Sequence, residues 1–352
     1  SDLEKVLAGK NVSVSTSISE IKNSVSGSST VKDIEVFFQL LYLTLTSPRL
    51  DTGLAATFRS SQKMMYTFAS ASTEFSYLDT TYKVLYNDNP LLVSPLPKPA
   101  DFDKINVNHA LAIYKSAFSF ADGYKFFLVG KMDSTQVKVL ITKYLGSLFR
   151  SETEQRFSDD GLRPIQGEHK FIFKKGSEYK SMISGYYFGE TPYSEEIAIK
   201  VRAASEVLNI KIIEELREKL SAIYSGQIGA SLNRDPYPHY EVMIFLPCGP
   251  ENVDTLMSAL QTEINKLIEK GPDKADLDKV KTQLIEHYRT NIKENAYWLG
   301  KLESIVGDGY NPGLILKYPE IINMLSEKDV QEAAKLVFGG KNKFYSILYP
   351  DK

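Results

Sequence analysis

Two side chains close in sequence, Arg217 and Tyr224, could together act on a peptide bond. Arg217 lies in the segment LREKL, which ends a long predicted helix, and Tyr224 begins the strand predicted next, followed directly by Ser225 and Gly226. A guanidinium can hold a peptide carbonyl or a carboxylate, and a phenol hydroxyl can donate a hydrogen bond to a developing oxyanion. A helix end that meets a sheet would place these two groups side by side, so they form a candidate site.

Both residues also have a purely structural interpretation. Arg217 could pair with Glu214 or Glu218 on its own helix. Tyr224 has the strand parity of Ile228, Ala230 and Leu232, which favours a tyrosine buried in the core. The residues by themselves therefore leave both catalysis and packing open at this position.

A second candidate is an incomplete zinc motif at residues 283–287. The segment reads QLIEH, which is the inverted motif H-x-x-E-H with its first histidine replaced by glutamine. Working motifs hold zinc with two histidines one helical turn apart and use the glutamate as the base. Glutamine is a poor zinc ligand and no third ligand is evident, so we interpret Gln283, Glu286 and His287 as a solvated helix face.

Two further groups lack the partners that their chemistry requires. Gly130-Lys131 follows a predicted strand as a phosphate-binding loop would, but the glycine spacing is wrong and Met132 replaces the Ser or Thr that holds magnesium. Cys248, the single cysteine, has no histidine nearby in sequence to activate it and cannot form an intramolecular disulfide. We predict a buried or half-buried thiol without a catalytic role.

The composition is that of an ordinary globular chain, long enough for about two domains. The 352 residues are 43% hydrophobic and carry a formal charge of −2, which argues against nucleic-acid binding because that requires a basic surface. No apolar run approaches the roughly 20 residues of a membrane-spanning helix. The tyrosine-rich positions are predicted to pack in the core rather than to stack on bases: Tyr42, Tyr66, Tyr77, Tyr82, Tyr86, Tyr186 and Tyr187.

Hydrophobic periodicity predicts the elements of the first half. Residues 12–19 alternate valine, threonine or isoleucine with serine, which is typical of a half-buried strand, although a serine-rich loop is the alternative. The later segments are predicted as a helix at 34–45, more helix through 51–86, an irregular proline-rich stretch at 90–99, a helix near 106–118, a strand at 124–129 and a helix at 134–147.

A polar stretch with glycine and proline, residues 153–168, is predicted to link this half to the next. The second half is predicted to hold strands at 170–175 and 180–188, a helix at 197–220, strands at 222–233 and 239–246, helices at 251–270, 273–293 and through 294–337, and a strand at 343–349. Runs of strands followed by helices indicate the α+β class. We predict two domains, residues 1–152 and residues 169–352, each with an antiparallel-rich sheet packed on helices.

The two predicted domains share a repeated pattern. Residues 105–129 and residues 325–349 both read as a capped helix, a phenylalanine, a short polar turn and an aromatic strand. Because the second copy extends upstream of this pattern to near residue 165, an equally long first copy would begin roughly 55 residues before Ser1. We therefore expect the first domain to lack its N-terminal part, although a similarity this short could also arise by chance.

Several segments resemble zinc peptidases of the pitrilysin/insulysin type, the inverzincins, over nearly the whole chain. They are Ser26–Ser29 with Asp33, Thr46–Asp51, Leu216–Leu220 with Tyr224 and Ser225, Pro250–Asp254 and Asn295–Leu299. The resemblance is greatest to the C-terminal half of the long bacterial members, which carry four homologous α+β domains. It implies the pitrilysin/insulysin-like metallopeptidase fold, with two homologous domains in this chain.

In that family the N-terminal half carries H-x-x-E-H and the zinc, and the C-terminal half closes over the substrate. The resemblance implies that Arg217 and Tyr224 are catalytic and that Arg217, Tyr224, Ser225 and Gly226 bind substrate. It implies no zinc ligand and no cofactor in this chain, a peptide or protein substrate, and the N-terminal catalytic half of the same polypeptide as partner. Without H-x-x-E-H the chain would be inactive alone. The family resemblance alone implies a periplasmic or exported protein.

Two other functions remain open at this stage. The chain could be a non-catalytic interaction subunit of a peptidase-like assembly, and an H-x-x-E-H motif in the same gene would then be absent. It could also be an unrelated α+β binding module. One residue departs from the family pattern: Ser221 stands where many members have glycine before the strand, which puts the approach of Tyr224 in doubt.

Overall fold

The computed structural model describes residues 2–118, 120, 123–149, 157–212, 226–307 and 309–351. Its contacts divide the chain into two compact units. Unit 1 comprises residues 1–66, 98–158 and 295–310, and unit 2 comprises residues 67–97, 159–294 and 311–352. The predicted division into two homologous domains with a linker at 153–168 stays a prediction, and the described part of that linker, residues 157–167, has no regular secondary structure.

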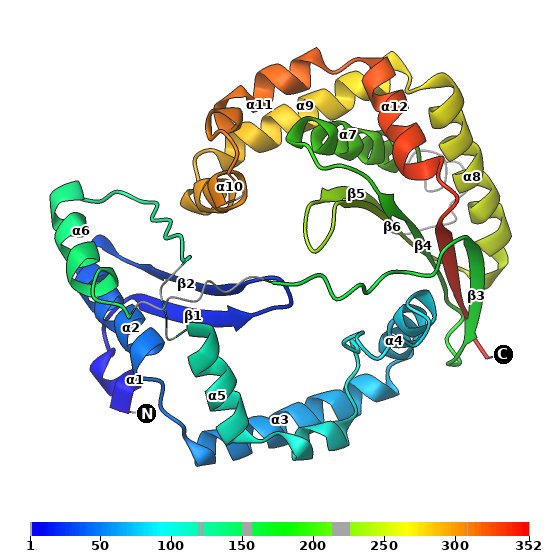
Figure 1. Cartoon of the computed structure of the whole chain (residues 1–352). Coiled ribbons are helices and arrows are strands. Elements are labelled where there is room, and N and C mark those ends of the chain that lie inside the picture. Colours follow the sequence, from blue (N-terminus) through cyan, green and yellow to red (C-terminus); the bar gives the residue numbers. More distant parts are fainter. Residues whose placement is uncertain are drawn as a thin grey trace. The chain divides into compact units, whose positions relative to one another are not determined.

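Unit 2 contains a five-stranded sheet (Figure 1). Its strands are β3 (Glu168–Lys174), β4 (Ser181–Glu190), β5 (Gln227–Asn233), β6 (His239–Cys248) and β7 (Lys343–Tyr349). The order across the sheet is β3-β7-β4-β6-β5. The β3–β7 pair is parallel and the other pairs are antiparallel. The last strand of the chain lies between β3 and β4, whose paired residues come 156 to 175 positions earlier in the sequence.

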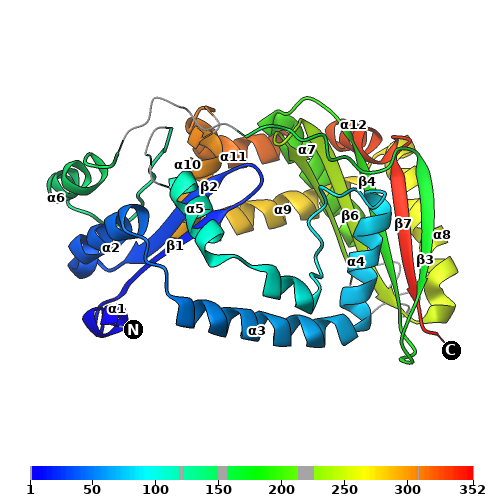
Figure 2. The ribbon, with the colours of Figure 1, turned by 60° about the horizontal axis from the view of Figure 1, so that its bottom comes forward.

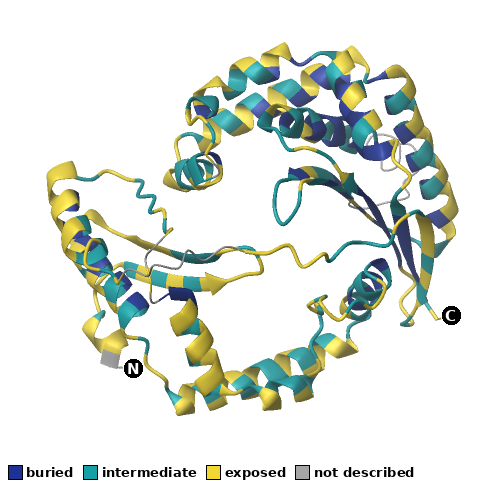
Figure 3. Cartoon of the chain, in the orientation of Figure 1, coloured by how far each residue is buried: buried dark blue, intermediate teal, exposed yellow. Residues whose placement is uncertain are grey.

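Helices cover one face of this sheet and bury its core. The helices of unit 2 on this side are α7 (Glu195–Ile212), α8 (Val253–Lys270), α9 (Lys274–Asn291), α11 (Gly313–Met324) and α12 (Glu327–Phe338). Alternate residues of β6, from Tyr240 to Cys248, are buried against them, as the period of a strand requires. Figure 3 shows the buried positions gathered on the central strands and on α7 and α12.

The opposite face is covered by α4 (Thr73–Leu85) where it crosses β3 and β7. Figures 1 and 2 show α4 on the other side of the sheet from α7, α8 and α12. Tyr77 is fully buried there and its hydroxyl donates to the carbonyl oxygen of Ser346 at 2.8 Å. Tyr186 and Tyr187 are also buried, which confirms for these three positions that the tyrosines pack in the interior.

Unit 1 is built on a two-stranded antiparallel sheet, β1 (Val12–Ile18) and β2 (Asn23–Ser29). Val14 and Val25 pack on one face against α2 (Ile34–Thr46) and α5 (Val107–Phe118), while facing serine hydroxyls bond across the other face. The strand predicted at 12–19 is thus confirmed. The other helices of unit 1 are α1 (Asp2–Val6), α6 (Ser134–Leu140) and α10 (Asn295–Gly307), and α3 (Thr52–Ala71) begins in unit 1 and ends in unit 2.

The strand predicted at 124–129 is wrong: these residues have no regular secondary structure. The hydroxyl of Tyr124 donates instead to the carbonyl oxygen of Ala117, and its ring stacks on Phe126 with ring centres 5.9 Å apart. The matching segment of unit 2, β7, is a strand because β3 and β4 flank it on both sides. A strand exists only as part of a ladder, so the same local pattern gives different structures with and without partners.

The overall assignment to the α+β class is confirmed, with an antiparallel-rich sheet packed on helices. The helix that begins the second repeat is also capped as predicted, since Ser326 and Asp329 form a reciprocal capping box at the start of α12. None of the helices in the described ranges combines the length and the apolar character that a membrane crossing needs.

Candidate functional site

The segment that carries the candidate pair connects α7 to β5. Residues 213–225 lie outside the described part of the chain, and Arg217, Tyr224 and Ser225 lie among them. Gly226 is described: it is half-buried and directly precedes β5. The catalytic and substrate-binding roles predicted for these four residues stay predictions.

The two elements that flank this segment are fixed to each other. The helix α7 packs along β5, and the side-chain oxygen of Asn209 accepts a hydrogen bond from the backbone N–H of Ile228 at 3.2 Å. Ile228 and Leu232 are buried on the side of β5 that faces α7. The last turn of α7 and the first residues of β5 are therefore held together.

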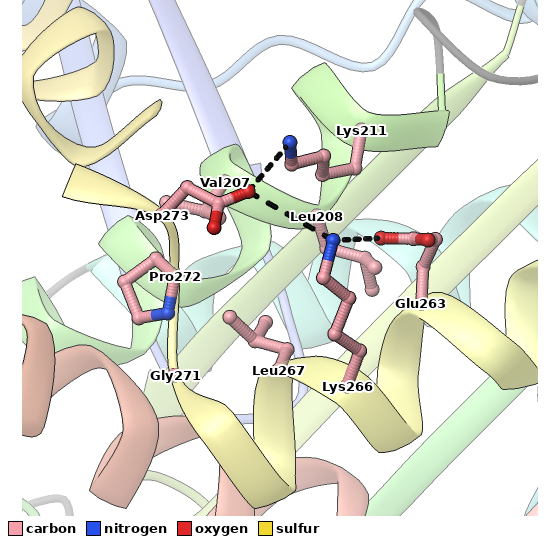
Figure 4. Close-up of a pocket in the computed structure, with 9 residues that line it drawn as sticks. All are labelled: Val207, Leu208, Lys211, Glu263, Lys266, Leu267, Gly271, Pro272 and Asp273. Atoms are coloured by element: carbon pink, nitrogen blue, oxygen red, sulfur yellow. Dashed lines mark ion pairs between the residues drawn. The ribbon is translucent and has the colours of Figure 1, made fainter. Parts of the chain in front are cut away.

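A cluster of ion pairs stabilises the end of α7 (Figure 4). The ammonium of Lys211 lies 2.6 Å from Asp276 and 3.1 Å from Asp273, both at the start of α9. Lys266 of α8 lies 3.8 Å from Asp273 and 3.9 Å from Glu263. A lysine in the last turn of one helix and aspartates in the first turn of another also complement both helix dipoles. The cluster ties together the three helices beside the candidate segment.

Lys211 and Asp273 remain charged through the neutral range and are suited to structure rather than to proton transfer. Hydrogen bonding to Asp276 raises the pKa of Lys211 well above its usual range. Hydrogen bonding to Lys211 lowers the pKa of Asp273. A general acid or base needs a pKa near the working pH, and both shifts move away from it. The pocket that these residues line is therefore a structural junction at the end of α7.

The incomplete zinc motif lies on the outside of α9. Gln283, Glu286 and His287 are exposed, and Glu286 pairs with Arg289 at 2.5 Å. Interpretation as a solvated helix face is confirmed for these three positions. In the described ranges, no group of three or more His, Cys, Asp and Glu side chains is arranged to hold a metal ion.

Cys248 ends β6 and is buried, as predicted. Burial raises the pKa of its thiol to about 12, and the nearby carboxylate of Glu251 contributes to the shift. Because the thiolate is the reactive form, a thiol with this pKa is a poor nucleophile at neutral pH.

The native chain is expected to react with iodoacetamide at pH 8 about a thousandfold more slowly than the urea-unfolded chain, because the unfolded thiol has a pKa near 8.5. The rate is measured by mass spectrometry, and the single cysteine makes the readout unambiguous. The unfolded chain is the control, and a native rate within tenfold of it would show that Cys248 is accessible.

The sequence did not predict one exposed surface, which lies on β6. On the face of β6 away from α7, α8 and α12, Glu241 is half-buried and Met243 and Phe245 are 46% and 39% exposed. Apolar residues occupy both parities of this strand, since Val242 and Ile244 are buried on its other face. The alternation that would have marked an open face is therefore hidden in the sequence.

Comparison with known proteins places the chain among peptidase relatives. The family model described as the peptidase M16 inactive domain matches residues 104–284, just over half of the chain. A protein of Haemophilus influenzae named "Probable zinc protease PqqL" is 25% identical over 344 residues, which cover 95% of this chain and 35% of that protein. The chain thus spans about a third of the length of this relative.

Solved structures share the fold. The periplasmic protease PqqL of Escherichia coli matches with a TM-score of 0.85 and 19% identity, over 99% of this chain and 38% of its own. A peptidase M16 inactive domain from Pseudomonas fluorescens matches with a TM-score of 0.80 and 14% identity, over 99% of this chain and 83% of its own. Both likenesses confirm the peptidase-like α+β fold expected from the resemblance.

Proposed function

Because this chain belongs to the peptidase M16 inactive-domain family, we propose that it is the non-metal half of a zinc metallopeptidase, which binds peptide and stabilises the transition state. The observation that supports this most strongly is the agreement between the family match and a fold shared over 99% of the chain with a periplasmic protease. In this proposal the zinc and the H-x-x-E-H base are supplied by an N-terminal catalytic half, and the protein acts in the periplasm.

The proposed contribution of this chain is electrostatic and positional. Arg217 would hold a carbonyl or carboxylate of the peptide, and Tyr224 would donate a hydrogen bond to the oxyanion that develops as the peptide bond is attacked. Ser225 and Gly226 lead into β5 and offer backbone groups to an extended peptide. The fixed ends at Asn209 and Ile228 support this assignment, because a catalytic pair must be held by rigid elements.

A combination experiment tests the proposal. The chain is purified alone, then together with the half of the peptidase that carries H-x-x-E-H, and both preparations are assayed with a fluorogenic peptide. We expect no chelator-sensitive hydrolysis by the chain alone and hydrolysis by the combination. Chelator-sensitive hydrolysis by the chain alone would contradict a role as the non-metal half.

A non-catalytic interaction subunit is the second candidate. The family description itself, an inactive domain, favours it. The two candidates predict different full-length reading frames. An intact H-x-x-E-H in the same reading frame supports the peptidase, and its absence supports the interaction subunit. Failure of the combined halves to cleave any peptide, while still forming a stable complex, would favour the interaction subunit.

A further inference from the structure

Among the described residues, two strands of unit 2 have one face that is only partly covered. We call the residues of β5 and β6 that point away from α7 the β5–β6 open face, and they are Gln227, Gly229, Ser231, Glu241, Met243 and Phe245. The helix on this side, α4, packs mainly on β3, β7 and β4. Met243 and Phe245 consequently remain 46% and 39% exposed at neighbouring positions of one strand. Adjacent exposed apolar side chains on a sheet are typical of a binding surface.

There is room above the centre of this face. Gly229 lies opposite Met243 in the register of β5 and β6. A Cβ built on Gly229 would meet no atom within 4 Å among the residues that the structure describes. Because Gly229 has no side chain, the surface beside Met243 is recessed, and the backbone of a bound chain can approach the sheet closely.

Glu241 places a carboxylate at one end of this face, and no described Lys or Arg forms an ion pair with it. It is half-buried between Phe188 and Ser231, its register partners on β4 and β5. Burial raises the pKa of Glu241, and the nearby imidazole of His239 opposes this shift. No Lys or Arg from the described ranges forms an ion pair with Glu241. A desolvated carboxylate without a bonded cation has free energy to gain from one.

The neighbouring groups do not supply that cation. His239 has its Nδ1 2.6 Å from the carbonyl oxygen of Tyr237 and its Nε2 3.2 Å from the side-chain nitrogen of Asn233. Both ring nitrogens of His239 therefore already have hydrogen-bond partners other than Glu241.

Arg163 also interacts with groups other than Glu241. Its guanidinium lies over the ring of Tyr237, 3.2 Å from the ring centre, and pairs with Asp159 at 2.6 Å and with Glu190 at 3.6 Å. Tyr82 of α4, which feels the charge of Glu241, is an uncharged phenol in the neutral range because burial raises its pKa. Among the described residues near Glu241, these groups therefore leave its carboxylate without an ion-pair partner.

We propose that the β5–β6 open face is a subsite for an extended peptide with a basic side chain at one position and an apolar side chain two positions further on. The inference rests on the proposed function and adds a sequence preference to it. Side chains two residues apart in an extended chain lie about 7 Å apart on one side, which is also the spacing from Glu241 to Met243 along β6. The basic group meets Glu241, and the apolar group covers Met243 and Phe245.

Fluorescence anisotropy with three labelled peptides tests the preference on the chain itself. The peptides are identical except at one position, which is lysine, alanine or glutamate two residues before a leucine. We expect the lysine peptide to bind about tenfold more tightly than the alanine peptide and the glutamate peptide to bind most weakly, as expected for one charge-assisted contact. Glu241→Gln removes the charge at nearly constant shape and should abolish the lysine preference.

Two further variants complete the design. Glu286→Gln removes an exposed carboxylate on the outside of α9 and should leave all three affinities unchanged. Met243→Ser should weaken the lysine and alanine peptides by the same factor, because it removes only the apolar contact. Circular dichroism verifies the fold of each variant.

The outcomes separate this inference from the proposed function. If the peptides bind but Glu241→Gln leaves the lysine preference intact, the subsite is rejected and peptide binding by the chain stands. If none of the peptides binds to the unmodified chain at any concentration tested, the inference is rejected. The proposed function is judged separately, by whether the combined halves cleave peptide.

Discussion

Replacing Tyr224 with phenylalanine is expected to lower the kcat of the combined peptidase about a hundredfold, as removal of one oxyanion donor typically does. In the proposed role the hydroxyl acts on the charge that develops in the transition state and not on the bound ground state, so KM should change little. Steady-state kinetics with a fluorogenic peptide measure both constants. The loss of a single oxygen atom leaves the aromatic ring in place, so the fold is retained.

Matched variants distinguish this role from packing. Tyr179→Phe removes the hydroxyl of a tyrosine that is 73% exposed, and it should leave kcat unchanged. Arg217→Lys keeps the charge but loses the bidentate geometry, so it should raise KM. An unchanged kcat in Tyr224→Phe would assign Tyr224 to the core, which is the structural interpretation of its strand parity.

The second large effect concerns stability. Replacing Lys211 with methionine is expected to lower the free energy of unfolding by about 2 kcal/mol, because Asp276 is then left buried without its strongest partner. Asp276 is only 3% exposed, and Lys279 remains 3.6 Å from it, which limits the loss. Thermal unfolding followed by circular dichroism should show Tm lowered by about 5 °C.

Two controls locate the effect in the buried pair. Lys328→Met breaks an exposed pair with Glu332 at 3.8 Å and should change stability by less than about 0.5 kcal/mol. The double variant Lys211→Met with Asp276→Leu removes both charges and should recover most of the loss, because the uncompensated carboxylate is gone. A Tm for Lys211→Met equal to that of Lys328→Met would contradict a stabilising role for this cluster.

The same cluster gives a pH dependence with a definite sign. The pKa of Lys211 is raised by folding, so its contribution is fully present below its ordinary value of 10.5 and is lost as the pH rises further. The pKa of Asp273 is lowered by folding, so its contribution is present above its ordinary value of 3.8 and is lost as the pH falls. Between pH 3.8 and 10.5 Lys211 and Asp273 contribute a constant amount to the free energy of unfolding. Changing the pH within the neutral range should therefore not alter stability through these two groups.

Local patterns in the sequence predicted much of the fold. The alternation in residues 12–19 became β1, and the apolar spacing of Ile34, Phe38, Leu41 and Leu45 became the buried face of α2. Tyr77 was predicted to pack, but its partner Ser346 could not be named, because the two residues are 269 positions apart. The periodicity of a segment indicates which face is buried and leaves open what covers it.

Local sequence patterns predicted less of the candidate sites than of the fold. Arg217 and Tyr224 came from residue chemistry and from a family resemblance, and the structure describes the elements on either side of them, α7 and β5. Glu241 was missed altogether, since nothing in a strand that is apolar at both parities shows which face is open. Which face of a sheet is exposed depends on where the helices pack. Helix packing is set by contacts throughout the unit and not by the sequence of one strand.

By itself the sequence determined the positions of most helices and strands, the α+β class and the capped start of α12, because period and capping are set by residues a few positions apart. Only the tertiary structure decided that residues 343–349 form a central strand while residues 124–129, with the same pattern, form none. The physical reason is that a strand is stable only when distant segments complete its hydrogen bonds, and β7 has β3 and β4 beside it.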